Sequence, residues 1–167
     1  MNGARMVVEF NAFEIFEIAE KIERNGAKFY RRAAELFDDS NTHKMFLQLA
    51  EWEKAHEQFF AGMRKDLFVQ GPKLRTFETK NDVVFDAQSM AGLAVFGNRM
   101  DPAVELTGKE SITDILKCAI EKEKDTIVFY TGLKDFVSAQ AGKDKIDDII
   151  KEEMHHVRIL KESLELR

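Results

Sequence analysis

Cysteine, proline and long apolar runs are scarce in this sequence, and each shortage excludes a class of protein. One cysteine, Cys118, among 167 residues excludes a disulfide framework and any zinc, iron or iron–sulfur site held by several cysteines of the chain. The presence of only 2 prolines and 9 glycines excludes a collagenous or proline-rich chain and favours helices. The longest apolar run, residues 90–96, is far shorter than the ~20 residues of a membrane-spanning helix.

The charge balance is mildly acidic. The 30 acidic and 25 basic side chains give a net charge of −5, which argues against a nucleic-acid partner. The N-terminus has no basic segment followed by an apolar stretch, so we expect neither a signal peptide nor a membrane partner. The length suits one domain with a full core, residues 1–167, and not two. We therefore expect a single-domain cytoplasmic protein.

Four long segments carry apolar residues at spacings of three and four, the pattern of one helical face. Capping boxes precede two of them, at Asn11–Glu14 and Ser111–Asp114. Turn residues at 38–42, 71–72 and 141–142 separate the segments. The predicted helical faces run over residues 11–37, 46–67, 111–137 and 146–164.

The middle of the chain, residues 68–110, has no long helical period, although it contains an apolar patch at 83–96. A connection this long inside one domain needs a structural reason. Helices of ~27 residues are about 40 Å long, and about 40 residues of extended chain easily span that length. The sequence therefore predicts an all-α fold, a four-helix bundle with a long crossover between helices 2 and 3.

Charged residues stand on the predicted inward faces. Buried carboxylates are costly unless they are paired or bind a metal. The inward charged residues are Glu23, Glu53, His56, Glu123, Glu153 and His156. Each of the first three lies 100 positions before one of the last three, so the chain consists of two helix pairs with the same pattern.

This arrangement of donors suits two metal ions. Glu and His three residues apart lie on one face of a helix and can bind neighbouring positions of one site. Four carboxylates and two imidazoles balance the charge of two divalent cations and leave room for an oxygen species. Oxygen and nitrogen donors without a thiolate favour iron or manganese over copper(I) or a structural zinc.

The sequence allows two other interpretations of these positions. Glu152 and His155 also form a Glu-x-x-His pair, but they share a face with Asp148 and would be solvated. A second reading makes all six residues surface charges, which would require the same error in face assignment on four helices.

Aromatic residues beside the candidate donors also need an assignment. Tyr30 and Tyr130 lie two turns after each lone glutamate on the same face, and we expect them to donate hydrogen bonds to a ligand carboxylate. The alternative for them is a core tyrosine whose hydroxyl is satisfied elsewhere. Trp52, Phe59 and two methionines, Met45 and Met100, are interpreted as packing or subunit contacts.

Four stretches of the sequence resemble rubrerythrin-type members of the ferritin-like superfamily. They are IERNGAKFY at 22–30, LAEWEKAH at 49–56, AIEKEKDTIVFY at 119–130 and IIKEEMHHVRIL at 149–160. The resemblance spans residues 11–165 and implies a ferritin-like bundle with a non-haem diiron site, in which the six inward residues are the ligands. It further implies two iron ions, for which manganese or zinc could substitute, peroxide or dioxygen chemistry, a role in oxidative stress, and a homodimer.

Two departures from the family pattern bear on function. Rubrerythrins carry a rubredoxin domain, which one cysteine does not allow here, so an external electron donor such as a rubredoxin-like protein is expected. They also carry an extra carboxylate where this chain has Thr126, so His56 is expected to stay bound in both redox states of a near-symmetric site. The first expectation is an oxidoreductase acting on hydrogen peroxide or dioxygen. The alternatives are a ferroxidase-like iron-handling protein and a module with a structural metal pair.

Overall fold

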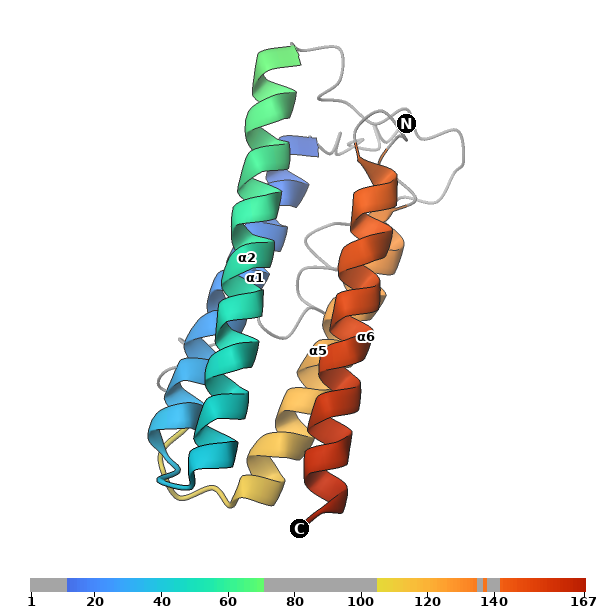
Figure 1. Cartoon of the computed structure of the whole chain (residues 1–167). Coiled ribbons are helices and arrows are strands. Elements are labelled where there is room, and N and C mark those ends of the chain that lie inside the picture. The colour runs from blue at the N-terminus through green and yellow to red at the C-terminus, as the bar shows by residue number, and fades with distance from the viewer. Residues whose placement is uncertain (1–11, 71–104, 135–136, 138–141) are drawn as a thin grey trace, which may run out of the picture.

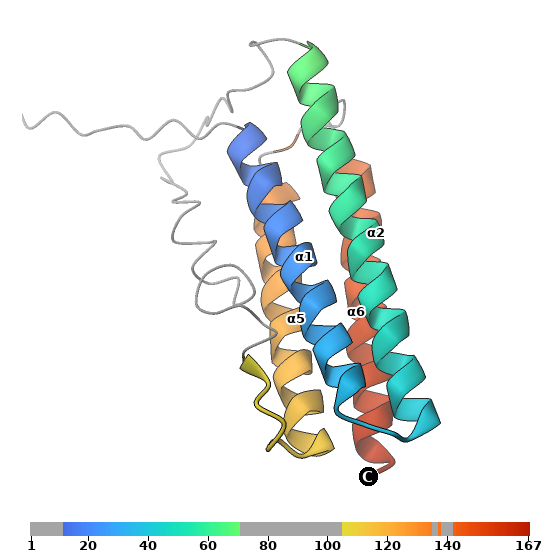
Figure 2. The same cartoon turned by 90° about the vertical axis from the view of Figure 1, so that its left-hand side faces the viewer.

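Four long helices form the bundle in this computed structural model, which describes residues 12–70, 105–134, 137 and 142–167. The helices are α1 (Ala12–Glu35), α2 (Ser40–Gln70), α5 (Ile112–Lys134) and α6 (Lys143–Glu165). Helices α1 and α2 form one antiparallel pair and α5 and α6 form the other (Figure 1). Helices α2 and α5 run in the same direction in both views (Figures 1 and 2). The predicted all-α four-helix fold is confirmed.

The helix starts follow the turn chemistry of the sequence. Two backbone N–H groups at the start of α2 donate to the Asp39 carboxylate at 3.3 and 3.1 Å. At α5 the backbone N–H of Asp114 donates to Ser111 Oγ at 3.2 Å, and the N–H of Ser111 donates to the Asp114 carboxylate at 3.1 Å. This reciprocal pair is the predicted capping box. Gly142 precedes α6 at φ 102°, a conformation that glycine adopts without strain. The predicted cap at Asn11 lies outside the described residues.

The predicted inward faces form the core. Nearly all of their members are buried, and Phe37, Val157 and Leu164 are partly buried against the core. Aromatic rings supply much of the packing, and the largest fully buried side chains are Tyr30, Tyr130, Phe16, Phe29, Phe46, Phe60 and Phe129. Burial of so many apolar rings dominates the stabilisation of a bundle of this kind.

The end of the predicted crossover packs against the bundle. Leu106 is buried in the core, and its carbonyl accepts a hydrogen bond from Arg32 Nε at 3.3 Å. Glu105 pairs with the buried Lys122 of α5 at 3.0 Å. Most of the predicted crossover, including the apolar patch at 83–96 and Met100, lies outside the described residues, and α2 continues to Gln70, beyond the predicted boundary. Among the helices described, none is long and apolar enough to cross a membrane.

Candidate metal centre

The six charged residues of the inward faces meet inside the bundle. Helices α1 and α5 each contribute one glutamate, while α2 and α6 each contribute a glutamate and a histidine one turn later. All six residues are buried, and no more than 3% of the surface of any of them is exposed. The structure therefore brings together every residue that the sequence singled out as a ligand, and their binding of metal stays a prediction.

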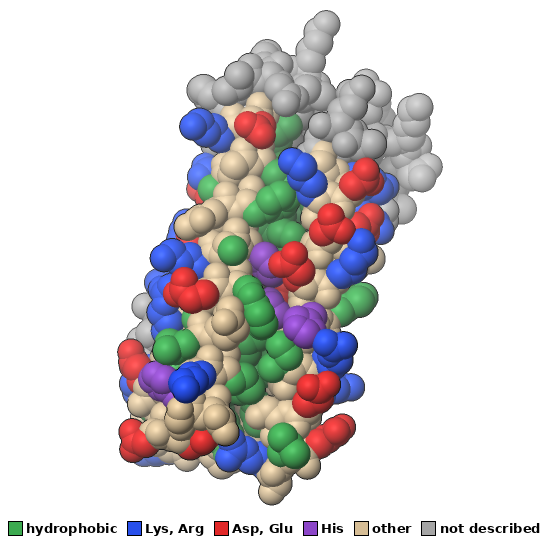
Figure 3. All heavy atoms as spheres, viewed as in Figure 1, with side chains coloured by type: hydrophobic (Ala, Val, Ile, Leu, Met, Phe, Trp, Pro, Cys, Tyr) green, Lys and Arg blue, Asp and Glu red, His purple; other side chains and the backbone are tan. Residues whose placement is uncertain are grey.

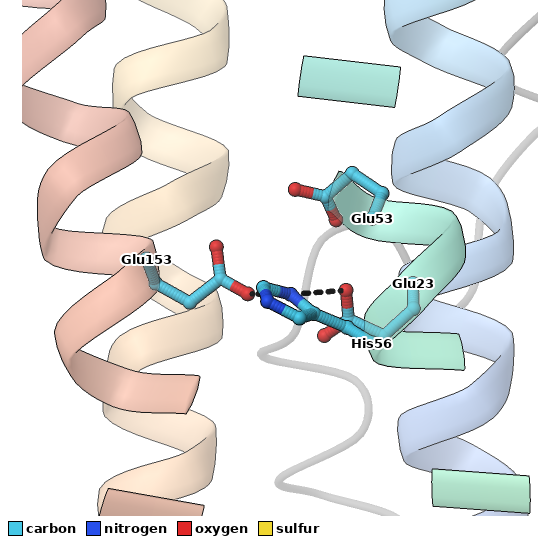
Figure 4. A group of neighbouring side chains, drawn as sticks. All are labelled: Glu23, Glu53, His56 and Glu153. Carbon is cyan, nitrogen blue, oxygen red and sulfur yellow. Dashed lines mark ion pairs between the residues drawn. The ribbon is translucent and has the colours of Figure 1, made fainter. Parts of the chain in front are cut away.

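The donor atoms form two overlapping groups of four. Within each group the atoms lie within 4.8 Å of one another, close enough to surround one metal ion. The first group is Glu23, Glu53, His56 and Glu153, drawn in Figure 4, and the second is Glu53, Glu123, Glu153 and His156. Glu53 and Glu153 belong to both groups, so these two carboxylates are placed to bridge a pair of ions.

Glu153 lies between the two imidazoles. His56 Nδ1 is 2.9 Å from Glu153 Oε1 and 3.4 Å from Glu23 Oε2. His156 Nδ1 is 2.9 Å from Glu153 Oε2, 3.2 Å from Glu53 Oε1 and 3.7 Å from Glu123 Oε1. Both histidines therefore direct Nδ1 toward the carboxylates.

The candidate metal-ligand atoms are buried and also lack hydrogen-bond partners among the described residues. Within the part of the chain that the structure describes, seven of them lack a hydrogen bond of acceptable geometry. They are Glu23 Oε2, Glu53 Oε1, His56 Nδ1, Glu123 Oε2, both carboxylate oxygens of Glu153, and His156 Nδ1. Buried polar atoms nearly always have hydrogen-bond partners in folded proteins. A group of such atoms that lack partners and are directed at one place therefore indicates a position for a ligand. Oxygen and imidazole nitrogen donors fit iron or manganese, and the residues present fit a dimetal centre.

The electrostatics of the cluster follow from burial and crowding. Burial and the neighbouring carboxylates raise the pKa of Glu53 well above its usual value. Burial, together with Glu153, also raises the pKa of Glu123, to about 8. Without metal, Glu123 is therefore largely protonated at neutral pH, and burial with nearby carboxylates also favours the protonated form of Glu53.

The pKa values of Glu153 and of the two histidines shift against the effect of burial. Burial alone would raise the pKa of Glu153, but its contacts with His156 and His56 outweigh burial and lower that pKa. Burial alone would lower the pKa of His56, but its contacts with Glu153 and Glu23 raise that pKa to about 12. The pKa of His156 is raised for the same reason, by its carboxylate neighbours. The metal-free site is therefore an anionic Glu153 between two imidazolium groups.

The two tyrosines donate to carboxylates across the bundle. The Tyr30 hydroxyl donates to Glu123 Oε1, and the Tyr130 hydroxyl donates to Glu23 Oε1. Each tyrosine thus bonds to the lone glutamate of the opposite helix pair. Burial and nearby carboxylates raise the pKa of both phenols well above the usual value, so both stay protonated donors. These are the hydrogen bonds expected from the sequence, although the spacing did not indicate the exchange between pairs.

Two residues outside the predicted site contact its histidines. Glu152 is exposed, as expected for the rejected register, but its Oε2 lies 2.8 Å from His56 Nε2. Trp52, interpreted from sequence as a packing or subunit contact, stacks on His156 with ring centroids 5.2 Å apart and planes 10° apart. Residues 52 and 152 are equivalent in the repeat of 100, but the repeat does not indicate that either one contacts a histidine of another helix.

A glycine in the middle of α1 is explained by the site. A Cβ on Gly26 would lie 2.5 Å from Glu53 Oε2, closer than van der Waals contact allows, so Gly26 leaves room for a bridging carboxylate. Its equivalent in the second pair is Thr126, which is buried. Thr126 is the position at which the family resemblance leads one to expect an extra carboxylate.

Comparisons with known proteins agree with this geometry. The rubrerythrin family model matches residues 14–164, a range that includes all six candidate ligands. A crystal structure of a provisionally assigned ferritin-like diiron-carboxylate protein from Thermotoga maritima is similar, with a TM-score of 0.68 and 25% sequence identity. The similarity covers 94% of this chain and 96% of that one. A comparison with curated proteins gives no match.

Proposed function

The chain belongs to the rubrerythrin family, and we propose that it binds two iron ions in its buried cluster and reduces hydrogen peroxide or dioxygen there. The observation that carries this proposal is the set of seven buried donor atoms without hydrogen-bond partners among the described residues. The site holds four carboxyl groups and two imidazoles. Two divalent cations would displace the protons that these groups hold without metal and would balance the four negative charges of the ionised carboxylates.

The geometry assigns donors to each ion. Glu23 and His56 would hold one ion and Glu123 and His156 the other, with Glu53 and Glu153 shared between them. Bound iron would supply electrons to the oxygen species and polarise it. The shared carboxylates would keep the two ions close enough to act on one small molecule.

The surrounding residues pack aromatic rings beside the site and donate hydrogen bonds to it. Phe60 packs on the Tyr130 ring with centroids 5.0 Å apart, and Phe46 stacks on the Tyr30 ring at 6.2 Å. Buried apolar rings beside the tyrosines lower the local dielectric constant, which strengthens the electrostatic interactions in the cluster. The phenol protons of both tyrosines point at the outer carboxylates, where they fix the orientation of each carboxylate and its lone pairs.

Electrons for turnover have to come from another molecule. Reduction of hydrogen peroxide to two water molecules consumes two electrons and two protons. The single cysteine of this chain cannot form the four-cysteine iron site of a rubredoxin domain. A rubredoxin-like protein or a flavoprotein is therefore the proposed donor.

Stopped-flow oxidation of the anaerobically loaded protein tests the proposal. With about two iron(II) ions per chain, the absorbance change should be much faster with peroxide than with dioxygen. Catalytic turnover should require an added reduced rubredoxin. The variant Glu53→Ala should abolish the absorbance change, while Glu51→Ala, which removes an exposed carboxylate from the same helix, should leave it unchanged.

Two results would contradict the proposal in different ways. Dioxygen faster than peroxide, with uptake well beyond two iron(II) ions per chain, would favour the iron-handling alternative. Bound iron that reacts with neither oxidant would favour a structural metal pair.

A further inference from the structure

We propose that the two metal positions, although built from the same donors, are unequal, because Glu152 supports His56 while Trp52 covers His156. The inference rests on the proposed function only in requiring that metal ions bind. The position formed by Glu23 and His56 is expected to be the tighter one. Glu152 is then a positioning residue for that metal position alone.

The hydrogen bond at His56 is the first observation. The ring directs Nδ1 at the carboxylate cluster, 2.9 Å from Glu153 Oε1. Its other nitrogen, Nε2, lies 2.8 Å from Glu152 Oε2, and the Glu152 side chain is 60% exposed while that of His56 is 4% exposed. A carboxylate that accepts from Nε2–H fixes the ring orientation and leaves the Nδ1 lone pair for a metal. It also makes the imidazole a stronger ligand.

The environment of His156 is different at the equivalent place. The indole of Trp52 lies nearly parallel to the His156 ring, 5.2 Å away, and the two histidine rings are 5.6 Å apart. Stacking holds the His156 ring by packing, without an anionic acceptor from residue 52. The chain therefore has a charged support in one half and an apolar cover in the other.

Both contacts lie in the seam between α2 and α6. Figure 3 shows histidine side chains and an adjacent acidic side chain at the surface in this seam, with hydrophobic side chains above and below them. The support for His56 therefore comes from a residue that is accessible to substitution without disturbing the core. This makes the asymmetry open to direct measurement.

Cobalt(II) titration of the full, metal-free chain tests the inference. Visible absorption with a competing chelator should give two binding steps of unequal affinity. Glu152→Gln should weaken the tighter step about 10- to 100-fold, the usual range for loss of a partner that orients a metal ligand, and leave the weaker step unchanged. The matched control is Asp148→Asn, the same charge change one turn earlier on α6, at a side chain 68% exposed and paired with Lys151. It should change neither step.

Histidine variants assign the two steps. In a His156→Ala background, which keeps only the His56 position, Glu152→Gln should still weaken cobalt binding about 10- to 100-fold. In a His56→Ala background, Glu152→Gln should have no effect, which is the independence expected of residues that share no contact. Equal losses in the two backgrounds would overturn the inference while leaving the metal site intact.

A second readout does not depend on these variants. Trp52 is the only tryptophan of the chain, so its fluorescence in the unaltered protein should change more during the second cobalt step than during the first. The larger change in the first step would also overturn the inference. A chain that binds no cobalt would overturn the proposed metal site itself, a result distinct from two equal steps.

Discussion

The two helix pairs, α1–α2 and α5–α6, carry the same candidate metal ligands in different surroundings. Each pair supplies one glutamate and one Glu-x-x-His, and each supplies a tyrosine to the other pair. Other residues beside the donors differ between the pairs, since Gly26 stands opposite Thr126 and Trp52 opposite Glu152 in the alignment by 100 residues. The candidate ligands are therefore the same in both pairs while some residues beside them differ, and this difference is the basis of the proposal that the two metal positions are unequal.

The shared carboxylates show the same inequality. Glu153 contacts both imidazoles at 2.9 Å, whereas Glu53 contacts only His156, at 3.2 Å. Because of these contacts the pKa of Glu153 is lowered while burial raises that of Glu53. Without metal, Glu153 therefore stays ionised to lower pH than an ordinary glutamate, whereas the protonated form of Glu53 is favoured.

The largest effect should be the difference in bound metal between variants that lose a shared ligand and variants that lose an unshared one. Glu53→Ala or Glu153→Ala removes a donor from both groups of four, so each variant should lose both metals of about two per chain. Glu23→Ala or Glu123→Ala removes a donor from one group only and should lose one. Elemental analysis after gel filtration measures the count. An equal loss in all four variants would show that the bridging assignment is wrong.

The next largest effect should be a difference in the stability of the metal-free protein between variants of the two shared carboxylates. Glu153→Gln removes the anion between two imidazolium groups and should lower the free energy of unfolding by about 3–5 kcal/mol, the usual cost of breaking a buried ion pair. Glu53→Gln replaces a carboxyl group whose protonated form burial favours by a neutral group of similar shape, and should cost no more than about 1 kcal/mol. Urea denaturation near pH 7 measures both values. Similar losses in the two variants would refute the inequality.

The pH dependence of metal stabilisation follows from the same charges. The pKa of Glu123 is raised from 4.5 to about 8, so its contribution to stability is present below pH 4.5 and is lost as the pH rises to 8. The pKa of His56 is raised from 6.5 to about 12, so its contribution also declines above pH 6.5. Metal binding displaces these protons and strengthens with pH. The increase in melting temperature on adding manganese(II) should therefore be larger at pH 8 than at pH 5, and an increase independent of pH would contradict the assignment.

Substitution of Gly26 in α1 should have a smaller and more local effect. Gly26→Ala places a Cβ against Glu53 Oε2, so the Glu53 carboxylate has to move and cobalt affinity should fall about 10- to 100-fold. The control is Gly62→Ala in α2, where a Cβ would meet nothing within 4 Å. It should leave cobalt affinity unchanged and raise the free energy of unfolding by about 1 kcal/mol through helix propensity. Unchanged affinity in both variants would refute the steric role of Gly26.

The crossed tyrosines should give the smallest effects. Tyr130→Phe removes the hydrogen bond to Glu23 and should weaken the His56 position about 10-fold, whereas Tyr30→Phe removes the bond to Glu123 and should weaken the His156 position to a similar extent. Cobalt titration in the single-histidine backgrounds measures each effect. Tyrosine variants that weaken the position of their own helix pair would show that the crossed pairing is wrong.

Much of the fold and all of the candidate ligands could be predicted from the sequence, because both depend on local spacing. A helical face follows from a period of 3.6 residues, and Ser111 with Asp114 marks the start of α5 within one turn. The assignment of Glu153 and not Glu152 to the inward face followed from the same period, and Glu153 is buried while Glu152 is exposed. The roles of Glu152 and Trp52 could not be predicted, since each depends on a side chain of another helix.

The sequence by itself determined the four helices, their inward faces and the repeated donor set, since each is written in spacings along one helix or in the repeat of 100. Only the tertiary structure decided which carboxylates are shared and which tyrosine bonds to which glutamate. It also decided that His56 is held by a carboxylate and His156 by an indole. Those contacts join residues 93, 107 and 96 positions apart for Tyr30–Glu123, Tyr130–Glu23 and His56–Glu152. Their geometry depends on how far apart the packed helices lie and how they are rotated, which core packing sets and no local pattern records.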